Sequence, residues 1–448
     1  MWGVIELPTA IEIFKYLPKK NCGKCNYPTC LAFAMQIANA KAKLEDCPFV
    51  PEEAKSALAA SAAPPIRLVK VGSGKEAVEM GDETELYRHE RKFFHPIAYA
   101  IEVSDSSTPK EIEARVHRIA NMSYERVGQI LKFDMIAVRN SSKDPLIFAE
   151  AVEQVSKLSD MALVLISDDA EAMRMAVGRA ASKRPLLFGA NKQNYLAMCT
   201  VAKASSCPLV VSEPAGLDEL ADLVAKIKSE GIEDVVLDIG AKDLKQQLEM
   251  CTIVRKVSVK KIFRGLGYPM LISAGKGEGA VLKGLLATMK YGSLVVFEDI
   301  DAAQALSLFV LRQNIFTDPQ VPIQVKPGIY AVNGAKEDSP LLFTTNFSLT
   351  YFTVLADIEK SRVPAWLLVV DTEGLSVMTA FSAGKLTPES VVKGLEASGA
   401  KERSKRGEII IPGMVTRMSG KLQEAAGLKV IVGPKESSGL PKFLKNLY

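Results

Sequence analysis

Short apolar runs alternate with amphipathic segments between residues 96 and 297, and the runs are rich in Val, Ile and Leu. Continuous apolar runs of this length are typical of strands buried on both faces, as in parallel sheets. Each run is followed by a polar or glycine-containing turn and then by an amphipathic segment such as 110–120 or 191–204. This order predicts a (β/α)8 TIM barrel with strands at 96–103, 133–138, 162–166, 185–188, 208–211, 234–239, 269–274 and 294–297.

The segment that precedes the first run, residues 66–94, is expected to lead into the barrel. Its Gly72-Ser73-Gly74 follows a β-rich run but lacks the full pattern of a phosphate-binding loop. We interpret these three residues as a turn, and the segment as a hairpin across the bottom of the barrel.

A second α/β pattern follows a proline-punctuated connection, residues 317–328. Helical segments such as 349–360 and 389–397 separate its apolar runs, which predicts a small doubly wound sheet with strands at 328–332, 341–344, 365–370, 408–411 and 429–432. Ligands of such sheets bind beyond the carboxyl ends of the strands. There the chain has small, polar or glycine residues at 344–346, 371–376, 412–413 and 433–435, which would let a large planar ligand or a phosphate approach the backbone. Ordinary turns share this composition.

Residues 1–60 are predicted to form a separate small domain. Thr9 is a candidate cap for a helix that runs through Tyr16 and ends at Pro18, and the Ala-rich stretch 31–46 has apolar residues near helical spacing. The low-complexity stretch 57–65 is interpreted as a linker. The predicted domains are therefore 1–60, 61–320 and 321–448.

Four of the seven cysteines, Cys22, Cys25, Cys30 and Cys47, lie near the N-terminus in the order C-x2-C-x4-C-x16-C. A structural zinc site usually pairs its ligands as two CxxC knuckles, and the second pair is missing here. Disulfides are not expected, because no signal peptide precedes the motif and the other cysteines lie in apolar contexts typical of reduced thiols. An iron–sulfur cluster fits better than zinc, although the order matches neither common ferredoxin spacing.

Charge is nearly balanced along the chain, with 56 basic and 52 acidic residues. Because there is no long basic run, nucleic acid is a poor candidate partner. No apolar stretch reaches the roughly 18 residues of a membrane span, and the hydrophobic content of 48% supports several buried cores. We therefore expect a soluble, cytoplasmic protein. Lys15, Lys19, Lys20 and Lys24 surround the cysteine loop, either as a solvated face or as a surface that offsets thiolate charge and meets an acidic partner.

Polar residues stand at the predicted carboxyl ends of the barrel strands, where barrel active sites lie. Helix capping alone accounts for most of them, because turns before helices favour Ser, Asp and Asn. The chain's only histidines are His89, His95 and His117, so histidine-based catalysis at the barrel mouth is not expected. The mouth residues are Ser104, Asp105, Arg139, Asn140, Ser167, Asp168, Asp169, Asn191, Glu213, Asp238 and Glu298.

Four stretches together resemble the large subunit of the corrinoid iron–sulfur protein of the acetyl-CoA (Wood–Ljungdahl) pathway. They are LPKKNCGKCNYPTCLAFAMQIANAKAKLEDCP, APPIRLVKVG, PLLFTTNFSLTYF and VVDTEGLSV. They span all three predicted domains in matching order. The cysteine run is the most specific of them.

That resemblance implies two cofactors: a 4Fe–4S cluster on the four N-terminal cysteines, and a cobamide, a cobalamin-type corrinoid, in a C-terminal flavodoxin-like domain. It also implies a heterodimer with a small barrel subunit. The Co(I) cobamide is then expected to accept a methyl group from a methyltetrahydropterin, bound on a separate methyltransferase, and to deliver it to acetyl-CoA synthase. A low-potential electron donor would act through the cluster to return Co(II) to Co(I). The chain would be the methyl-carrying component of a corrinoid-dependent methyltransferase, without catalytic residues of its own.

Resemblance and loop position together also suggest the cobamide contacts. One side of the site is expected from the end of the second C-terminal strand, another from the loop after the third, and the nucleotide tail near the last. Ser376 could equally cap the following helix. The candidates are Thr345, Asn346, Ser348, Asp371, Thr372, Glu373, Gly374, Leu375, Ser376, Gly433 and Pro434.

Many cobalamin domains place a DxHxxG histidine beneath cobalt, yet no histidine follows His117 here. Imidazole ligation from the C-terminal domain is therefore excluded, and we expect a base-off, histidine-off corrinoid. Loss of a strong axial nitrogen ligand destabilises the oxidised states relative to Co(I), and each ~59 mV of upward shift favours reduction tenfold for a one-electron couple.

Two alternatives remain open at this point. The barrel itself could bind the pterin and catalyse methyl transfer, with Asn191 and Asp238 as candidate residues. The chain could instead be an iron–sulfur electron carrier with a flavin in the C-terminal domain, since doubly wound sheets also hold FMN.

Overall fold

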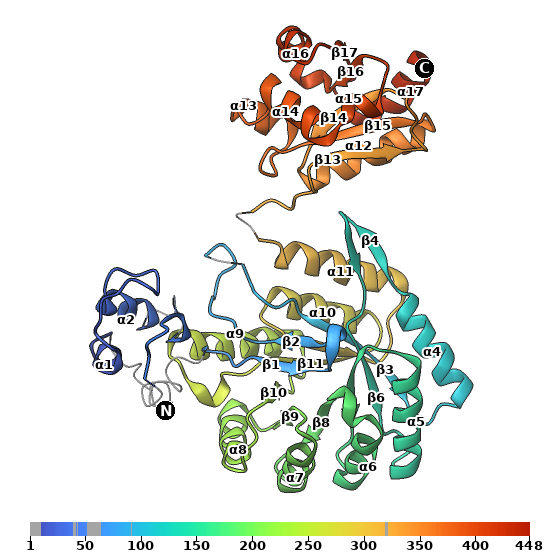
Figure 1. Cartoon of the computed structure of the whole chain (residues 1–448). Coiled ribbons are helices and arrows are strands. Elements are labelled where there is room, and N and C mark those ends of the chain that lie inside the picture. Colours follow the sequence, from blue (N-terminus) through green and yellow to red (C-terminus); the bar gives the residue numbers. More distant parts are fainter. Residues whose placement is uncertain (1–9, 39–41, 43, 52–63, 91, 319–320) are drawn as a thin grey trace. The chain divides into compact units, whose positions relative to one another are not determined.

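The computed structural model describes residues 10–38, 42, 44–51, 64–90, 92–318 and 321–448 (Figure 1). It divides into a barrel unit, residues 1–124 with 131–316, and a C-terminal unit, residues 317–448 with 125–130. Within the described ranges, no helix combines the length and apolarity needed to cross a membrane.

The N-terminal part contains two short helices that pack against each other. These are α1 (Ala10–Tyr16) and α2 (Cys30–Ala38), followed by a 3-10 turn, η1 (Leu44–Asp46). Ile13 of α1 and Phe33 of α2 lie in one buried cluster. The predicted cap Thr9 falls outside the described residues, and the helix predicted over 31–46 is described only as far as Ala38.

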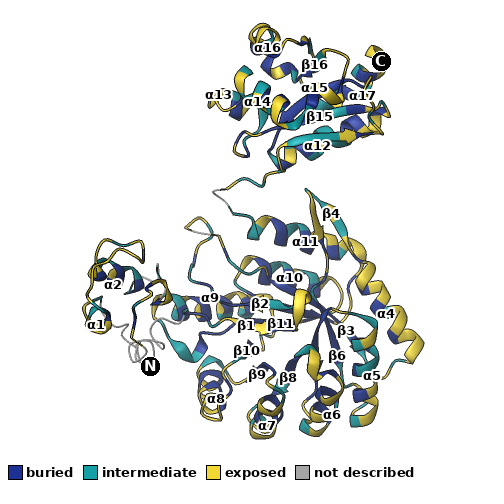
Figure 2. Cartoon of the chain, viewed as in Figure 1, coloured by how far each residue is buried: buried dark blue, intermediate teal, exposed yellow. Residues whose placement is uncertain are grey.

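The predicted barrel is confirmed. Eight parallel strands close into a ring, and β12 pairs with β3 through Val295 and Tyr99. Buried residues fill the strands (Figure 2). The strands are β3 (Ala98–Ser104), β6 (Met135–Arg139), β7 (Ala162–Ile166), β8 (Leu186–Ala190), β9 (Leu209–Ser212), β10 (Val235–Asp238), β11 (Met270–Gly275) and β12 (Leu294–Phe297).

Alternation along each strand separates the inside of the barrel from its helical shell. Ala98 and Ala100 of β3 belong to the inner cluster, whereas Tyr99 and Ile101 pack against the helices. Side chains at positions two apart share a face of a strand, which explains this division. The shell helices are α4 (Pro109–Asn121), α5 (Pro145–Leu158), α6 (Ala170–Ala180), α7 (Tyr195–Ser205), α8 (Leu217–Ser229), α9 (Leu244–Lys260), α10 (Glu278–Met289) and α11 (Ala302–Phe316).

The predicted hairpin closes the amino-terminal end of the barrel. Strands β1 (Val69–Val71) and β2 (Val78–Met80) pair antiparallel, and their apolar side chains join the inner cluster. The Gly72 N–H donates to Arg184 O at 2.9 Å, just before β8 begins. Gly72 has φ +89°, and a Cβ there would lie 3.1 Å from the Ala162 Cβ, so the turn requires glycine.

A second hairpin was not predicted from the sequence. Strands β4 (Tyr124–Arg126) and β5 (Gln129–Leu131) are joined by Val127 and Gly128, both with positive φ. Positive φ at both central residues matches the tight turn that suits a two-residue hairpin. Val at the first position gives no sequence signal for it.

The C-terminal unit is built on a five-stranded sheet in the order β13-β15-β14-β16-β17. Four strands are parallel and the edge strand β13 is antiparallel to β15. The segment that connects β13 to β14 is residues 333–340. It is too short for the crossover of about a dozen residues that a parallel connection needs, so β13 runs antiparallel. The strands are β13 (Gly328–Val332), β14 (Leu341–Thr345), β15 (Ala365–Val370), β16 (Glu408–Ile411) and β17 (Lys429–Val432).

Helices cover both faces of this sheet, as expected for a doubly wound arrangement. Leu368 of β15 belongs to one buried cluster and Leu367 to the other. The first cluster includes residues of α13, α14 and α16, and the second includes residues of α12 and α17. The helices are α12 (Ser348–Ser361), α13 (Val377–Ser382), α14 (Pro388–Ser398), α15 (Ala400–Arg403), α16 (Ser419–Ala426) and α17 (Leu440–Leu447), with 3-10 turns η5 (Gly413–Met418) and η6 (Ser437–Gly439).

Candidate functional site

The parallel sheet of the C-terminal unit changes winding direction at β14. Strand β14 continues through α12 to β15 on one side, and β16 lies on its other side. The two strands β14 and β16 are paired through Leu342 and Ile410. Ligands of doubly wound sheets bind at such a switch point, beyond the carboxyl ends of the strands.

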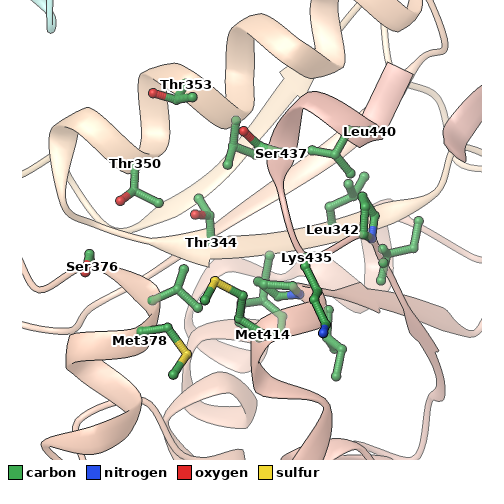
Figure 3. A pocket seen from close by; sticks show the side chains of 18 of the residues that line it. Leu342, Thr344, Thr350, Thr353, Ser376, Met378, Met414, Lys435, Ser437 and Leu440 are labelled. Carbon is green, nitrogen blue, oxygen red and sulfur yellow. The ribbon is translucent and has the colours of Figure 1, made fainter. Parts of the chain in front are cut away.

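A cavity of about 440 Å³ lies at this point. Its walls are mostly apolar. Three lining residues are also partly open to solvent: the exposed fractions of Leu349, Met378 and Met414 are 54, 39 and 47%. Figure 3 shows Thr344 near the middle of the lining side chains. The cavity has the volume and apolar lining of a small-ligand site, with polar groups at Thr344, Thr350, Thr353, Ser376, Lys435 and Ser437.

Thr344 differs from the other polar residues of the cavity lining in its burial and in its missing hydrogen-bond partner. It is fully buried, and its Oγ1 has no hydrogen-bond partner among the described residues. A buried hydroxyl without a partner costs about 1–3 kcal/mol. The neighbouring Thr345 Oγ1 is buried and unpartnered in the same way but does not line the cavity. Its place in the lining distinguishes Thr344 from Thr345 and makes it a candidate contact for a ligand in the cavity.

Asn346 holds the ends of β14 and β15 together. Its Nδ2 donates to Asp371 Oδ1 at 3.0 Å, and its Oδ1 accepts the backbone N–H groups of Thr372 and Gly374, each at 3.0 Å. Its Nδ2 also donates to Gln324 Oε1 at 3.1 Å. Asn346 is fully buried and does not line the cavity. Its side chain therefore shapes the loop 371–376 from behind.

Three of the residues that the sequence suggested for the cobamide line the cavity: Ser376, Gly433 and Pro434. Ser376 occupies the cap position of α13 without making a cap hydrogen bond, and its Oγ lies 3.0 Å from Thr379 Oγ1. The remaining candidates lie at the ends of β14 and β15, outside the cavity lining. They are Thr345, Asn346, Ser348, Asp371, Thr372, Glu373, Gly374 and Leu375.

Sequence reasoning missed several lining residues. Thr350 and Thr353 stand three apart on α12, so they share one helix face, and that helix begins directly after β14. Helical spacing next to a strand end was a usable signal. Met378 and Met414 carried none, because methionine is equally common in plain cores.

Two glycines allow the loops after β16 and β17 to meet. A Cβ on Gly413 would lie 2.5 Å from Gly433 O, and one on Gly433 would lie 3.0 Å from Ile411 O. Gly413 N–H donates to Pro434 O at 3.0 Å. From the sequence we expected these glycines to let a ligand approach the backbone. In the structure they let the two loops approach each other.

The four N-terminal cysteines lie in and beside one small core. Cys25, Cys30 and Cys47 are buried in the cluster that contains Phe33, whereas Cys22 is exposed. The Asn21 N–H donates to Cys30 Sγ at 3.4 Å, and Cys30 N–H donates to Asn21 Oδ1 at 2.8 Å. The loop therefore holds Cys30 by a pair of reciprocal hydrogen bonds with Asn21.

The backbone of the cysteine loop is tightly turned. Lys19, Asn21, Gly23 and Asn26 all have positive φ, between 46° and 68°. In the described part of the chain, no three Cys, His, Asp or Glu side chains converge as a site for a single metal ion. Four thiols are the donor type that holds iron–sulfur clusters.

The other cysteines are unsuited to metal binding or disulfide formation. All seven cysteines are free, and Cys199, Cys207 and Cys251 are buried. Burial raises the pKa of the Cys199 thiol to about 11 and of the Cys251 thiol to about 12, and it also raises the pKa of Cys207. These thiols stay neutral at ordinary pH, in agreement with the expectation of reduced interior cysteines.

Polar residues at the barrel mouth mostly serve the loops that carry them. Asp169 caps α6 through the Glu171 N–H, and Asp105 accepts the N–H groups of Ser141 and Ser142, each at 2.8 Å. Asn191 Oδ1 likewise accepts the N–H of Gln193 at 2.9 Å. Capping therefore explains Asp169, as the sequence suggested, whereas Asp105 and Asn191 hold the backbone of loops.

Asp238 and Arg139, two further mouth residues, form a hydrogen bond and an ion pair of their own. The Asp238 carboxylate accepts a hydrogen bond from Ser212 Oγ at 2.8 Å, and burial raises the pKa of the Asp238 carboxyl group. Arg139 donates twice to Glu102, at 2.5 Å each, beside a polar cavity of about 600 Å³ that Glu298 also lines. Asn191 and Asp238 do not line that cavity.

Comparison with known families gives two matches. A family described as "CO dehydrogenase/acetyl-CoA synthase delta subunit" matches residues 68–444. A second, described as "Putative Fe-S cluster", matches residues 17–49, which hold the four N-terminal cysteines.

Curated relatives match nearly the whole chain. The corrinoid/iron-sulfur protein large subunit of Moorella thermoacetica is 44% identical over 439 residues, covering 98% of each chain. The acetyl-CoA decarbonylase/synthase complex subunit gamma of Methanothermobacter thermautotrophicus is 33% identical over 455 residues, covering 98% of this chain and 99% of that one. Among solved structures, a dihydropteroate synthase of Coxiella burnetii aligns with a TM-score of 0.40 and 12% identity, over 56% of this chain and all of that one. That last likeness carries no argument about function.

Proposed function

We propose that this chain, which belongs to the family of corrinoid/iron–sulfur protein large subunits and acetyl-CoA decarbonylase/synthase gamma subunits, is a methyl carrier that holds a cobamide in its C-terminal unit and a 4Fe–4S cluster in its N-terminal cysteine loop. The observation on which this depends most is the apolar cavity between β14 and β16, where Thr344 Oγ1 is buried and unpartnered. The cysteine loop on the same chain provides the second, redox site.

When bound, the cobamide supplies a Co(I) nucleophile for a methyl group passed from a methyltetrahydropterin to acetyl-CoA synthase, and the cluster supplies the electron that restores Co(I) from Co(II). The protein contributes the binding of both groups and the exclusion of water. The chain is thus one component of a corrinoid-dependent methyltransferase.

The cavity suits the nucleotide tail of a cobamide. Its apolar walls would exclude water from a planar base, and Thr344 Oγ1 would donate to, or accept from, that base. Lys435 lies at the cavity edge, where its ammonium group could meet the phosphate of the tail. The parallel strands follow the order β15-β14-β16-β17, and this order supports a flavodoxin-like corrinoid domain.

The exposed rim of the cavity suits the corrin ring itself. Leu349, Met378 and Met414 offer apolar contact where the cavity opens. Asn346 fixes the loop that ends at Ser376, and this loop would form a second side of the ring site. The residues proposed from the sequence therefore divide into Ser376, Gly433 and Pro434, which would touch the ligand, and those that support them.

Cys22, Cys25, Cys30 and Cys47 are the proposed cluster ligands. Three are buried in an apolar core, and the Asn21 N–H is directed at Cys30 Sγ. Cluster potentials span roughly −700 to +450 mV, so the surroundings must set the value. Exposure of Cys22 would bring one edge of the cluster to the protein surface.

Axial ligation by histidine is not available to the cobamide from the C-terminal unit, because no histidine follows His117. We therefore propose that the cobamide binds base-off and histidine-off, with its own base in the cavity. An electron paramagnetic resonance spectrum of the Co(II) protein should lack superhyperfine splitting from an axial nitrogen. Splitting from such a nitrogen would refute this part of the proposal.

The names of the relatives support partners for the same function. A large subunit implies a small one, and a subunit gamma implies a complex that contains acetyl-CoA synthase activity. We propose a heterodimer with a small subunit, which receives methyl groups through a separate methyltransferase and electrons from a low-potential donor.

A labelled-methyl experiment tests the proposal. The anaerobic protein, loaded with cobamide and reduced, is mixed with methyltetrahydrofolate labelled in its methyl group, with and without the methyltransferase. We expect label on the protein only when the methyltransferase is present. Label transfer without it, together with direct binding of the pterin, would instead favour the barrel as a methyltransferase. Bound flavin and no cobalt would favour an electron carrier.

A further inference from the structure

We propose that the surface around the cysteine loop is the docking site for a small acidic electron-transfer protein. We call this surface the lysine face and define it as Lys15, Lys19, Lys20 and Lys24 together with the exposed Cys22. The inference rests on the proposed cluster, because the docked protein would deliver its electron there. The transferred electron leaves the reduced carrier and reduces the cluster by one electron, and no bond forms or breaks.

Charge is distributed very unevenly in this part of the sequence. From Ile13 to Leu44 the chain has no Asp or Glu, although basic and acidic residues are nearly balanced overall at 56 and 52. Lysines occupy positions 15, 19, 20, 24, 41 and 43 of the same stretch. A group of like charges attracts a partner of opposite charge and speeds the encounter between the two proteins.

The lysines of the loop are held in place without carboxylate partners. Lys20 and Lys24 place their ammonium groups over the same ring, that of Phe49, at 4.5 and 5.1 Å from its centroid. Lys19 lies over the Phe14 ring at 5.6 Å. No Asp or Glu of the described ranges forms a salt bridge with these lysines or with Lys15. Among the described residues, no ion pair therefore neutralises these four charges.

Exposed apolar side chains lie on the two helices that flank the cysteine loop in the sequence, α1 and α2. Tyr16 is 47% exposed, and Leu31 and Met35, four residues apart on one side of α2, are 40 and 52% exposed. Leu31 directly follows the proposed ligand Cys30. Small apolar contacts within a charged surface are suited to a weak, short-lived interface, the kind that electron-transfer proteins use.

Position favours this surface for electron entry. Cys22 and the residues around it, 19–24, are all exposed, whereas the other three proposed ligands are buried. An electron entering here would reach the cluster at its exposed ligand, Cys22. The alternative is that the lysines only offset the negative charge of the thiolates. In that case, replacing them should change the cluster potential rather than the docking of a partner.

Stopped-flow reduction of the anaerobic full-length protein separates these possibilities. The probe is a reduced bacterial two-cluster ferredoxin, and the variant is Lys20→Glu with Lys24→Glu. The matched control is Lys226→Glu with Lys228→Glu, the same charge change on exposed lysines of α8. Iron content and cluster potential are measured on each protein, and reduction by a small-molecule donor is measured alongside.

We expect the K20E/K24E protein to be reduced by the ferredoxin about tenfold more slowly or worse at low ionic strength. The difference should vanish near 1 M salt, where the Debye length is about 3 Å. Iron content, cluster potential and reduction by the small donor should stay unchanged.

Equal ferredoxin rates in the variant and the unaltered protein would overturn the inference. An equal loss of reduction rate in the K226E/K228E control would also overturn it. The same holds if reduction by the small donor slows as well and a shift in cluster potential explains the change. A chain that holds no iron–sulfur cluster would refute the proposed function, and this inference with it.

Discussion

The side-chain oxygen of Asn346 accepts a hydrogen bond from the backbone N–H of Gly374 at 3.0 Å. The first residue follows β14 and the second follows β15, so the bond joins the two loops that the sequence assigned separately to the candidate cobamide site. The same oxygen accepts from the N–H and Oγ1 of Thr372, each at 3.0 Å. One buried amide therefore sets the shape of the whole loop.

Replacing Asn346 with Leu should destabilise the C-terminal unit. Two backbone N–H groups would lose their acceptor, and each buried donor left unpaired costs about 1–3 kcal/mol. Asn346→Asp is not a mild control, because it keeps the acceptor but sets a second buried carboxylate against Asp371 Oδ1, to which Asn346 Nδ2 donates at 3.0 Å. Urea unfolding, followed by the fluorescence of Trp366 in β15 with Trp2 replaced by Phe, measures the difference. Equal stability of the Leu variant and the parent would contradict this role.

Gly374→Ala should lower cobamide uptake and leave the cluster intact. Gly374 has φ +77°, and a Cβ there would lie 2.7 Å from Gln324 Cγ, so both backbone and packing oppose a side chain. Gly384, with φ +69° and nothing within 4 Å of an added Cβ, is the matched control. Cobalt and iron per chain are measured for both variants. The assignment of this loop fails if Gly374→Ala binds as much cobalt as Gly384→Ala.

Thr344→Val and Thr345→Val should separate ligand binding from stability. Each replaces a buried, unpartnered hydroxyl by a methyl group of similar volume, so each should stabilise the cobamide-free protein, by about 1 kcal/mol. Only Thr344 lines the cavity, so only Thr344→Val should weaken cobamide binding, by about tenfold for a lost hydrogen bond of about 1.4 kcal/mol. Cobamide titrations and thermal melts check both expectations. Equal cobamide affinity in the two variants would argue against a hydroxyl contact.

Thiol alkylation should distinguish Cys22, the exposed member of the proposed ligand set, from the interior cysteine Cys251. In metal-free protein at pH 8, iodoacetamide should modify the exposed Cys22 and spare Cys251, whose pKa burial raises to about 12. Only about one part in ten thousand of such a thiol is thiolate at pH 8, and the thiolate is the reactive form. Because reactivity grows as the thiol loses its proton, Cys251 should become reactive only far above this pH or after unfolding. Peptide mass spectrometry gives the answer directly.

Removal of single cysteines should show the same division. Cys47→Ala should abolish most iron binding and leave cobalt unchanged, whereas Cys251→Ala should leave both metals unchanged. Iron loss in Cys251→Ala, or iron retention in Cys47→Ala, would refute the proposed ligand set.

The barrel strands were predictable because each is a continuous apolar run bounded by turn residues. The runs 162–166 and 294–297 coincide with β7 and β12. At Pro208 and Pro269, where two predicted runs began, the strand begins one residue later. Proline has no N–H to donate to the ladder, although the carbonyl groups of both residues accept hydrogen bonds from the neighbouring strand.

The cavity could not be predicted in the same way. Its walls depend on β14 lying next to β16, a pairing between strands that are far apart in the sequence and joined through Leu342 and Ile410. Small and polar residues at strand ends indicated the correct edge of the sheet and included Gly433. They did not indicate that Asn346 faces the loop behind the cavity rather than the cavity itself.

The β4–β5 hairpin was missed for a local reason. Its two-residue turn has Val127 with φ +53°, a conformation that favours Gly, Asn or Asp. Neither flanking strand exceeds three residues, so no alternation of apolar and polar positions marks it.

Metal analysis of the anaerobically purified protein, supplied with cobamide during preparation, tests the central claim most directly. Iron and cobalt are quantified in a single gel-filtration peak, against protein measured by amino-acid analysis. We predict about four iron atoms and about one cobalt atom per chain. Full iron occupancy with no cobalt, despite excess cobamide, would contradict the account.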